Sequence, residues 1–293
     1  MEVMNDYLVR VIAKDAGVRL LAARTTTLAE EARRRHKTDS TSTTALARAL
    51  TGGALVGATL KVGQRVALKF DGEGPLRKII VESDHYGRLR GYVAFPDVDL
   101  PARMGKEQVA RALGPGTLTV VKDLRLKELS ESIVPLATSE IDKDIELYLN
   151  QSEQIPSYVS VGALLDEDGA IRMSGGVAIQ SLPKPQTDTI YELVERMQEL
   201  PPIEELLGSG QSPDELAALI LEGIPYRRLE EFPLYFQCNC SRERSMKALT
   251  LLGLEDLEIL IAEGEATVDC HYCHDQYFFT KEELEALRDQ MEV

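Results

Sequence analysis

The four cysteines of this chain form two closely spaced pairs, and their spacing strongly limits how the C-terminal part can fold. One pair is a Cys-x-Cys at 238–240, the other a Cys-x-x-Cys at 270–273, and twenty-nine residues separate them. Two short-spaced pairs can converge on one tetrahedral ion, and four thiolates are a common ligand set of structural Zn²⁺. We therefore predict one Zn²⁺ per chain in the reduced state, bound by Cys238, Cys240, Cys270 and Cys273.

Other interpretations of the cysteines explain less of the pattern. Four buried apolar cysteines would not be expected to stand in pairs, and structural disulfides need an oxidising compartment. His271 lies within the second pair, His274 follows it directly, and either could replace a cysteine. Four thiolates, however, already complete a tetrahedron and leave no open position for catalysis. A thioredoxin-like Cys-x-x-Cys should open a helix, whereas this one precedes an expected strand at 276–279.

The N-terminal residues and the hydropathy pattern indicate the compartment. Residues 1–6 are acidic and have no basic region of the kind that opens a secretory signal. The longest nearly apolar stretch, Ala49 to Leu60, has only twelve residues, which is too short to span a bilayer. We expect a soluble, cytoplasmic protein with no membrane partner, in a compartment where thiols stay reduced.

The negative charge lies entirely in the C-terminal third of the chain. Residues 1–182 hold 24 acidic and 24 basic side chains, whereas residues 183–293 hold 24 acidic and 9 basic ones and so account for the whole net charge of −15. A nucleic-acid-binding module neutralises phosphates with a basic face. The acidic cysteine-containing part should repel DNA and RNA, so we expect no nucleic acid partner.

The first 182 residues combine short strands with separate helices. Stretches that alternate apolar and polar residues between turn signals predict strands at 7–12, 18–23, 65–70, 76–83, 89–94, 118–121, 159–165 and 171–179. Helical patterns cover 28–35 and 141–149, and a Ser/Thr cluster at 38–44 caps a longer helix that runs to about residue 61. Strands with segregated helices predict an α+β fold whose N-terminal domain mixes sheet and helix.

Composition divides the chain into three predicted parts. We assign 1–182 to the N-terminal α+β domain, 183–232 to a helical linker and 233–293 to a small zinc-binding domain. Prolines at 183 and 185 mark the first break, and three short helices are expected from 187 to about 229. Seven of the sixteen aromatic residues lie between 232 and 279 and predict a small core there. So small a domain needs an additional staple, here the metal.

No nucleotide-binding or catalytic motif is present. The glycines at 52, 53 and 57 are not followed by Gly-Lys-Ser/Thr, so close helix packing explains them better than a phosphate loop. His36 and His85 stand alone, with no nucleophile in a motif context, and we interpret both as structural or surface residues. We expect a protein that is not an enzyme and does not use ATP.

Several motifs resemble one chaperone family. The segment 236–244, Phe-Gln-Cys-Asn-Cys-Ser-Arg-Glu-Arg, is similar to the first zinc signature of the redox-regulated holdases, the thirty-three-kilodalton heat-shock chaperonins, and 270–273 with Tyr277 is similar to the second. Further landmarks in the family's order are 72–76, 90–93, 152–154 and 175–180, so that the resemblance runs from about residue 5 to 290. The stretch 133–139 departs from the family pattern, in which a glycine or two is expected there.

The resemblance implies a function that the spacing alone does not. Members of this family are inactive when reduced and zinc-bound. Oxidants convert the zinc thiolates to disulfides, the metal leaves and the C-terminal part unfolds. The activated protein, often a homodimer, then holds unfolding client proteins without ATP. The four cysteine roles transfer to Cys238, Cys240, Cys270 and Cys273, and no catalytic residue transfers.

On oxidation we expect disulfides within each pair, Cys238–Cys240 and Cys270–Cys273. Neighbours separated by one or two residues have the highest effective concentration once the metal leaves, and a Cys-x-Cys bridge should be strained and easily reduced. Two alternatives to the holdase remain open: an enzyme with a structural Cys₄ zinc module, and a constitutive interaction protein with the same module. No pattern in the sequence indicates the client-binding surface.

Overall fold

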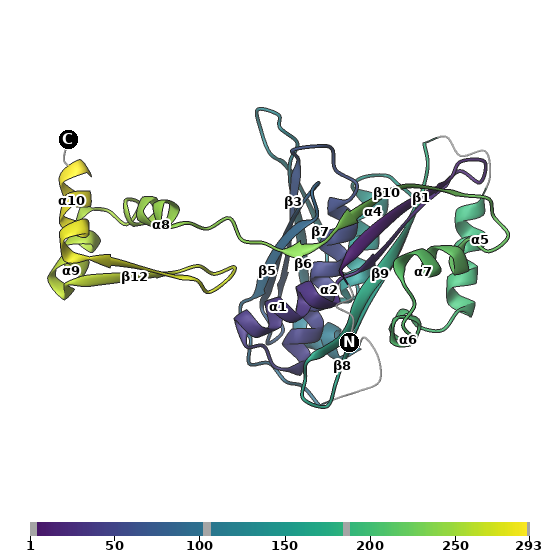
Figure 1. Ribbon diagram of the computed structural model, residues 1–293, viewed down its shortest axis with the longest axis horizontal. Coiled ribbons are helices and arrows are strands. Elements are labelled where there is room, and N and C mark those ends of the chain that lie inside the picture. Colours follow the sequence, from purple (N-terminus) through teal and green to yellow (C-terminus); the bar gives the residue numbers. More distant parts are fainter. Residues whose placement is uncertain (1–4, 102–106, 184–187, 292–293) are drawn as a thin grey trace. The chain divides into compact units, whose positions relative to one another are not determined.

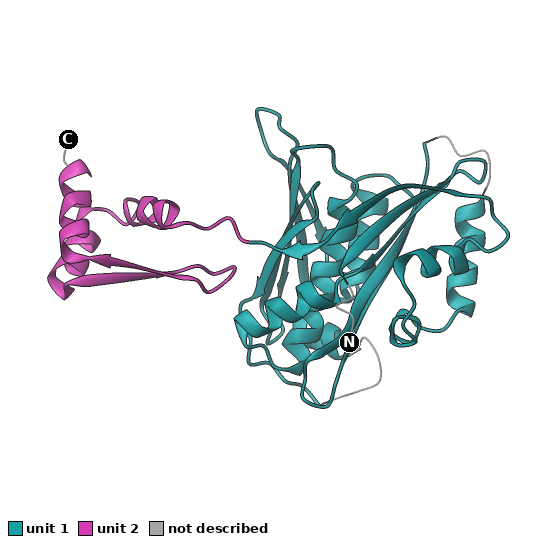
Figure 2. Cartoon of the chain, viewed as in Figure 1, with its two compact units in different colours: residues 1–237 teal, residues 238–293 magenta. Residues whose placement is uncertain are grey.

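The computed structural model describes residues 5–101, 107–183 and 188–291 (Figure 1). The chain forms two compact units, Met1–Gln237 and Cys238–Val293, which we call the N-terminal and C-terminal units (Figure 2). Strands and helices are mixed in both units, which confirms the predicted α+β class. None of the helices within the described residues is both long and apolar enough to cross a membrane.

The N-terminal unit contains a five-stranded antiparallel sheet with the order β10-β1-β2-β9-β8. Its strands are β1 (Tyr7–Ala13), β2 (Val18–Arg24), β8 (Ser157–Leu165), β9 (Ile171–Ser181) and β10 (Arg227–Pro233). Strand β9 is buried along almost its whole length, because helices cover both faces of this sheet. Strand β10 is the exposed edge and pairs with β1 through backbone hydrogen bonds.

A second sheet in the same unit has six strands in the order β11-β5-β4-β3-β6-β7. They are β3 (Arg65–Gly72), β4 (Lys78–Asp84), β5 (Arg88–Val93), β6 (Gly116–Asp123), β7 (Ser130–Pro135) and β11 (Tyr235–Phe236). Strands β3 to β5 alternate buried and partly exposed residues, so one face packs into the core and the other meets solvent. Strand β7 occupies part of the stretch 133–139 that departs from the family pattern.

The main core lies between the two sheets. Helices α1 (Thr26–His36), α2 (Ser40–Gly57), α3 (Glu107–Leu113) and α4 (Ile141–Gln151) contribute to it. Helix α2 is buried on nearly all sides and packs on strands of both sheets. A Cβ atom on Gly53 would lie 2.6 Å from the Val81 side chain, and one on Gly52 would lie 2.3 Å from Ile145. This confirms that the glycines of α2 serve close packing.

Three short helices follow residue 188, as the sequence predicted: α5 (Thr189–Glu199), α6 (Ile203–Gly208) and α7 (Pro213–Ile220). They do not form a free-standing connection. Leu193, Leu216 and Ile220 are completely buried in a second core against Val9, Leu20 and other residues of the five-stranded sheet. The boundary between compact units falls at 237/238, so the segment 183–232 belongs to the N-terminal unit. The division into three functional parts, 1–182, 183–232 and 233–293, stays a prediction.

The C-terminal unit is small. It comprises α8 (Arg242–Leu249), α9 (Leu254–Glu263), the antiparallel hairpin β12 (Glu265–Asp269) and β13 (Gln276–Thr280), and α10 (Lys281–Met291). Its core among the described residues consists of seven buried apolar side chains: Leu249, Leu257, Ile261, Ala266, Phe279, Leu284 and Leu287. A core of this size gives a domain little stability of its own.

Candidate metal centre

The first cysteine pair lies in the segment that precedes helix α8. The hydroxyl of Ser241 accepts a hydrogen bond from the backbone N–H of Arg244 at 3.3 Å and so caps the helix. The Arg244 guanidinium in turn donates to the backbone carbonyl of Asn239, between the two cysteines. The Ser-Arg-Glu-Arg sequence therefore holds the Cys-x-Cys segment against the first turn of α8.

The second pair occupies the turn of the β12–β13 hairpin. The backbone N–H groups of Cys273 and His274 donate to the carbonyl of Cys270 at 3.3 and 2.8 Å, and the N–H of Cys270 donates to the carbonyl of Asp275 at 3.0 Å. His274 adopts a left-handed conformation with φ 57°, which closes the turn. This local geometry brings the two sulfur atoms of the pair close together.

Arg242 joins the two cysteine segments of the C-terminal unit. Its guanidinium donates to the Phe278 carbonyl at 2.8 Å and to the Glu283 carboxylate at 2.7 Å, and it lies 4.5 Å from the centre of the Phe279 ring. The start of α8 is thereby attached to β13 and α10. Sequence reasoning missed this role, although Arg242 is part of the Ser-Arg-Glu-Arg signature.

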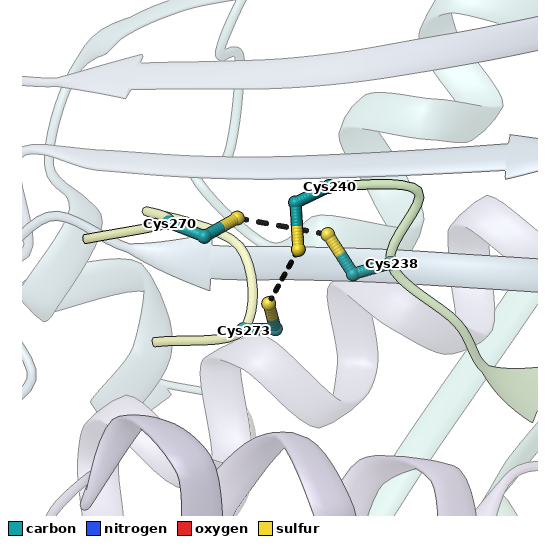
Figure 3. A group of neighbouring side chains, drawn as sticks. All are labelled: Cys238, Cys240, Cys270 and Cys273. Atoms are coloured by element: carbon teal, nitrogen blue, oxygen red, sulfur yellow. Dashed lines mark hydrogen bonds between the residues drawn. The ribbon is translucent and has the colours of Figure 1, made fainter. Parts of the chain in front are cut away.

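The structure brings all four predicted sulfur atoms together. The Sγ atoms of Cys238, Cys240, Cys270 and Cys273 all lie within 4.8 Å of one another. The Cys238–Cys270 and Cys240–Cys273 sulfur pairs are 3.6 and 3.3 Å apart (Figure 3). Four sulfur atoms at about 2.3 Å from a central Zn²⁺ would be separated by about 3.8 Å in a regular tetrahedron. The cluster therefore has dimensions that could hold a metal ion.

The surroundings of Cys270 and Cys273 disfavour the thiolate form. Burial raises the pKa of Cys270 and of Cys273, and hydrogen bonding to neighbouring sulfur atoms raises that of Cys273 further. The hydrogen bond to Cys240 raises the pKa of Tyr277. Thiols that are partly or fully buried resist deprotonation when no positive charge compensates them. A bound cation would supply that charge and would hold the sulfur atoms as thiolates.

The histidines lie outside this cluster, as expected. His271 and His274 are exposed in the hairpin turn and do not belong to the group of potential ligands. His36 is buried and stacks on Tyr92 at a centroid distance of 6.4 Å. His85 bonds through Nδ1 to the Leu60 carbonyl at 2.8 Å. The packing of His36 and His85 agrees with the structural roles that we predicted for them.

Comparisons with known proteins identify the family of this chain. The model of the family described as Hsp33 protein matches residues 6–280. The chain belongs to the Hsp33 family. A 33 kDa chaperonin of Geobacter sulfurreducens is 48% identical over 291 residues, which cover 99% of this chain and 97% of that relative. The Bacillus subtilis 33 kDa chaperonin is 41% identical, and the alignment covers 97% of this chain and 99% of that relative.

A solved structure of an Hsp33 homologue agrees as well. The crystal structure of the 33 kDa chaperonin from Thermotoga maritima superposes with a TM-score of 0.91 at 36% identity, covering 98% of this chain and 99% of that one. The names of these Hsp33 relatives describe chaperones and not enzymes. Membership in the Hsp33 family thus supports a chaperone function, with unfolded proteins as partners.

Proposed function

We propose that this protein is a redox-regulated, ATP-independent holdase that prevents aggregation of unfolding proteins in the cytoplasm under oxidative or heat stress. The observation that carries the proposal is the convergence of four cysteine sulfur atoms, all within 4.8 Å of one another, in a unit whose core has seven buried apolar side chains. A unit of this kind depends on its cysteine cluster to stay folded. Modification of the cysteines can therefore change the fold.

Zinc is the metal that this donor set fits best, because four thiolates in a closed tetrahedron form a typical structural zinc site. Bound Zn²⁺ would keep Cys238, Cys240, Cys270 and Cys273 as thiolates, the form that oxidants attack. A cysteine thiolate that attacks hydrogen peroxide becomes a sulfenic acid and releases hydroxide. A second cysteine thiolate then attacks this sulfur, forms the disulfide and releases another hydroxide. Each disulfide removes two ligands from the cluster.

We expect the reduced protein to contain one Zn²⁺ per chain. Atomic emission measures the stoichiometry, and X-ray absorption measures the ligand shell. Four sulfur neighbours at about 2.3 Å are expected. The variant Cys240→Ser should bind zinc much more weakly, whereas His274→Ala should bind it normally, because His274 is an exposed non-ligand. Less than half an equivalent of zinc, or a shell of three sulfurs and one nitrogen, would contradict the prediction.

We expect peroxide to produce the local disulfides Cys238–Cys240 and Cys270–Cys273. The folded cluster does not by itself select this pairing, because sulfur contacts of 3.6 and 3.3 Å also join the two pairs. Departure of the metal lets the segments separate, and sequence neighbours then meet most often. Peptide mapping by mass spectrometry distinguishes the two patterns. Dominant bridges between the pairs would show that the segments stay together during oxidation.

A client assay tests the function itself. Light scattering of a heat-denatured client is measured with reduced and with peroxide-treated protein. Suppression of aggregation should require peroxide treatment, and ATP should change it by less than about twofold, since the chain has no phosphate-binding motif. Equal suppression by both forms would support a constitutive interaction protein. No suppression by either form would favour an enzyme that carries a structural zinc module.

We also propose that the activated protein is a homodimer. Sedimentation of reduced and oxidised protein tests it. If the protein sediments as a monomer in both states, the proposed homodimer is wrong and any holdase activity belongs to the monomer.

A further inference from the structure

Tyr277 contacts the cysteine cluster through its hydroxyl group. It lies in strand β13, where it pairs with Val268 of β12, and it is half-buried. Its O–H donates a hydrogen bond to the Sγ atom of Cys240 at 3.0 Å. The hairpin that carries the second cysteine pair therefore also supplies a hydrogen-bond donor to the first pair.

Two other polar groups lie near the same sulfur atom. Cys273 Sγ is 3.3 Å from Cys240 Sγ, and Asp275 Oδ2 is 3.9 Å from it. Once Cys240 is a thiolate, the Asp275 carboxylate can only repel it, because both groups are acceptors. The Tyr277 hydroxyl can still donate, and a hydrogen bond to an ionised acceptor is stronger than one between neutral groups.

A hydrogen bond donated to a thiolate reduces the electron density that the sulfur can offer to an electrophile. Nucleophilicity of a thiolate falls as its charge is stabilised, and hydrogen bonds to ligand atoms tune a metal site in the same way. We propose that Tyr277 slows oxidation of Cys240 and thereby biases peroxide attack towards the other cysteines of the cluster. Tyr277 is a positioning residue in this scheme. The inference rests on the proposed redox function.

The affected step is the first attack on peroxide. The Cys240 thiolate forms an S–O bond as the peroxide O–O bond breaks; the sulfur loses two electrons and hydroxide leaves. The hydrogen bond must weaken during this attack, because the sulfur gives up its negative charge. The variant Tyr277→Phe removes the hydroxyl and keeps the ring.

The experiment uses the full reduced, zinc-loaded chain. Brief peroxide exposure is stopped with an alkylating reagent, and mass-spectrometric fragmentation gives the oxidised fraction at each cysteine. In Tyr277→Phe the initial oxidation rate of Cys240 should rise about three- to tenfold, because only part of the strength of a hydrogen bond to a charged group appears in the rate. The rates at Cys238, Cys270 and Cys273 should change by less than about twofold.

A second readout does not depend on oxidation. In Co²⁺-substituted protein, the sulfur-to-cobalt charge-transfer band should move to longer wavelength in Tyr277→Phe, because loss of the donor raises the energy of the sulfur lone pairs. The matched control is Tyr226→Phe, which removes one phenol hydroxyl from a residue that is 40% exposed in the N-terminal unit. It should change neither the band nor any oxidation rate.

The outcomes separate this inference from the proposed function. If peroxide oxidises none of the cysteines in the parent protein, the redox function fails and the inference fails with it. If the parent is oxidised normally but Tyr277→Phe leaves the Cys240 rate and the cobalt band unchanged, only the inference is overturned. Equal acceleration at all four cysteines would also overturn it, since a general loosening of the unit would then explain the effect.

Discussion

Removal of zinc should unfold the C-terminal unit while residues 1–182 stay folded. Zinc binding to small cysteine-rich modules supplies about 10–16 kcal/mol near neutral pH. This is comparable to the whole stability of a typical domain, about 5–15 kcal/mol. The seven-residue core of the C-terminal unit cannot compensate for such a loss. Within the described part of the chain, residues 1–182 supply all but one of the buried residues of the much larger main core, and they contain no cysteine.

Hydrogen exchange with mass spectrometry measures this directly. Amides of α9, β13 and α10 should lose nearly all protection after peroxide treatment or chelation, whereas those of α2 and β9 should keep theirs. Re-reduction with added Zn²⁺ is the control and should restore the original pattern. Retained protection in α9 and α10 without zinc would mean that the small core is sufficient by itself.

The segment 183–232 should lose protection together with the C-terminal unit, and we expect this coupled melting to activate client binding. The helices α5, α6 and α7 have 11, 6 and 8 residues, and isolated helices of fewer than about 12–15 residues are marginal in water. Eleven acidic and four basic side chains add self-repulsion. The burial of helices α5, α6 and α7 against the five-stranded sheet opposes melting. We therefore expect that mild heat is needed to complete the unfolding that oxidation begins. Client binding with α5–α7 still protected would contradict the mechanism.

The variant Glu204→Ala should destabilise the N-terminal unit by about 3–5 kcal/mol, the usual cost of removing one partner of a buried ion pair. Glu204 of α6 contacts Arg48 of α2 at 2.9 Å, and the two side chains are only 16% and 6% exposed. Arg48 Nε is already buried without a hydrogen-bond partner. Loss of the carboxylate would therefore leave a buried guanidinium without its counter-charge.

Urea unfolding followed by circular dichroism gives the change in the free energy of unfolding. The control is Glu285→Ala in α10, which breaks an exposed pair with Lys281 (41% and 51% exposed, 4.0 Å apart) and should cost less than about 1 kcal/mol. A cost below about 1 kcal/mol for Glu204→Ala would mean that water or another group compensates Arg48. If the variant also shows holdase activity without peroxide, α6 contributes to the inactive state.

Local patterns predicted most of the N-terminal elements. Alternation of apolar residues in β3, β4 and β5 reflects one face in the core and one in solvent, and this period of two is visible in the sequence. Strand β10 was missed and assigned to the helical linker, because its residues Arg227–Pro233 are charged and exposed. It is a strand because β1 offers backbone hydrogen bonds to it, and these leave no side-chain pattern.

The sequence by itself determined which four cysteines form the cluster. Metal binding requires short spacing within each pair, and this spacing can be read directly from the sequence. Only the tertiary structure decided which other residues act on the cluster. Tyr277 reaches Cys240 across 37 residues, and Arg242 reaches Glu283 across 41. Likewise, only folding brings Arg48 to Glu204, 156 residues away. Contacts of this kind depend on how separate elements pack, and no local spacing or periodicity records them.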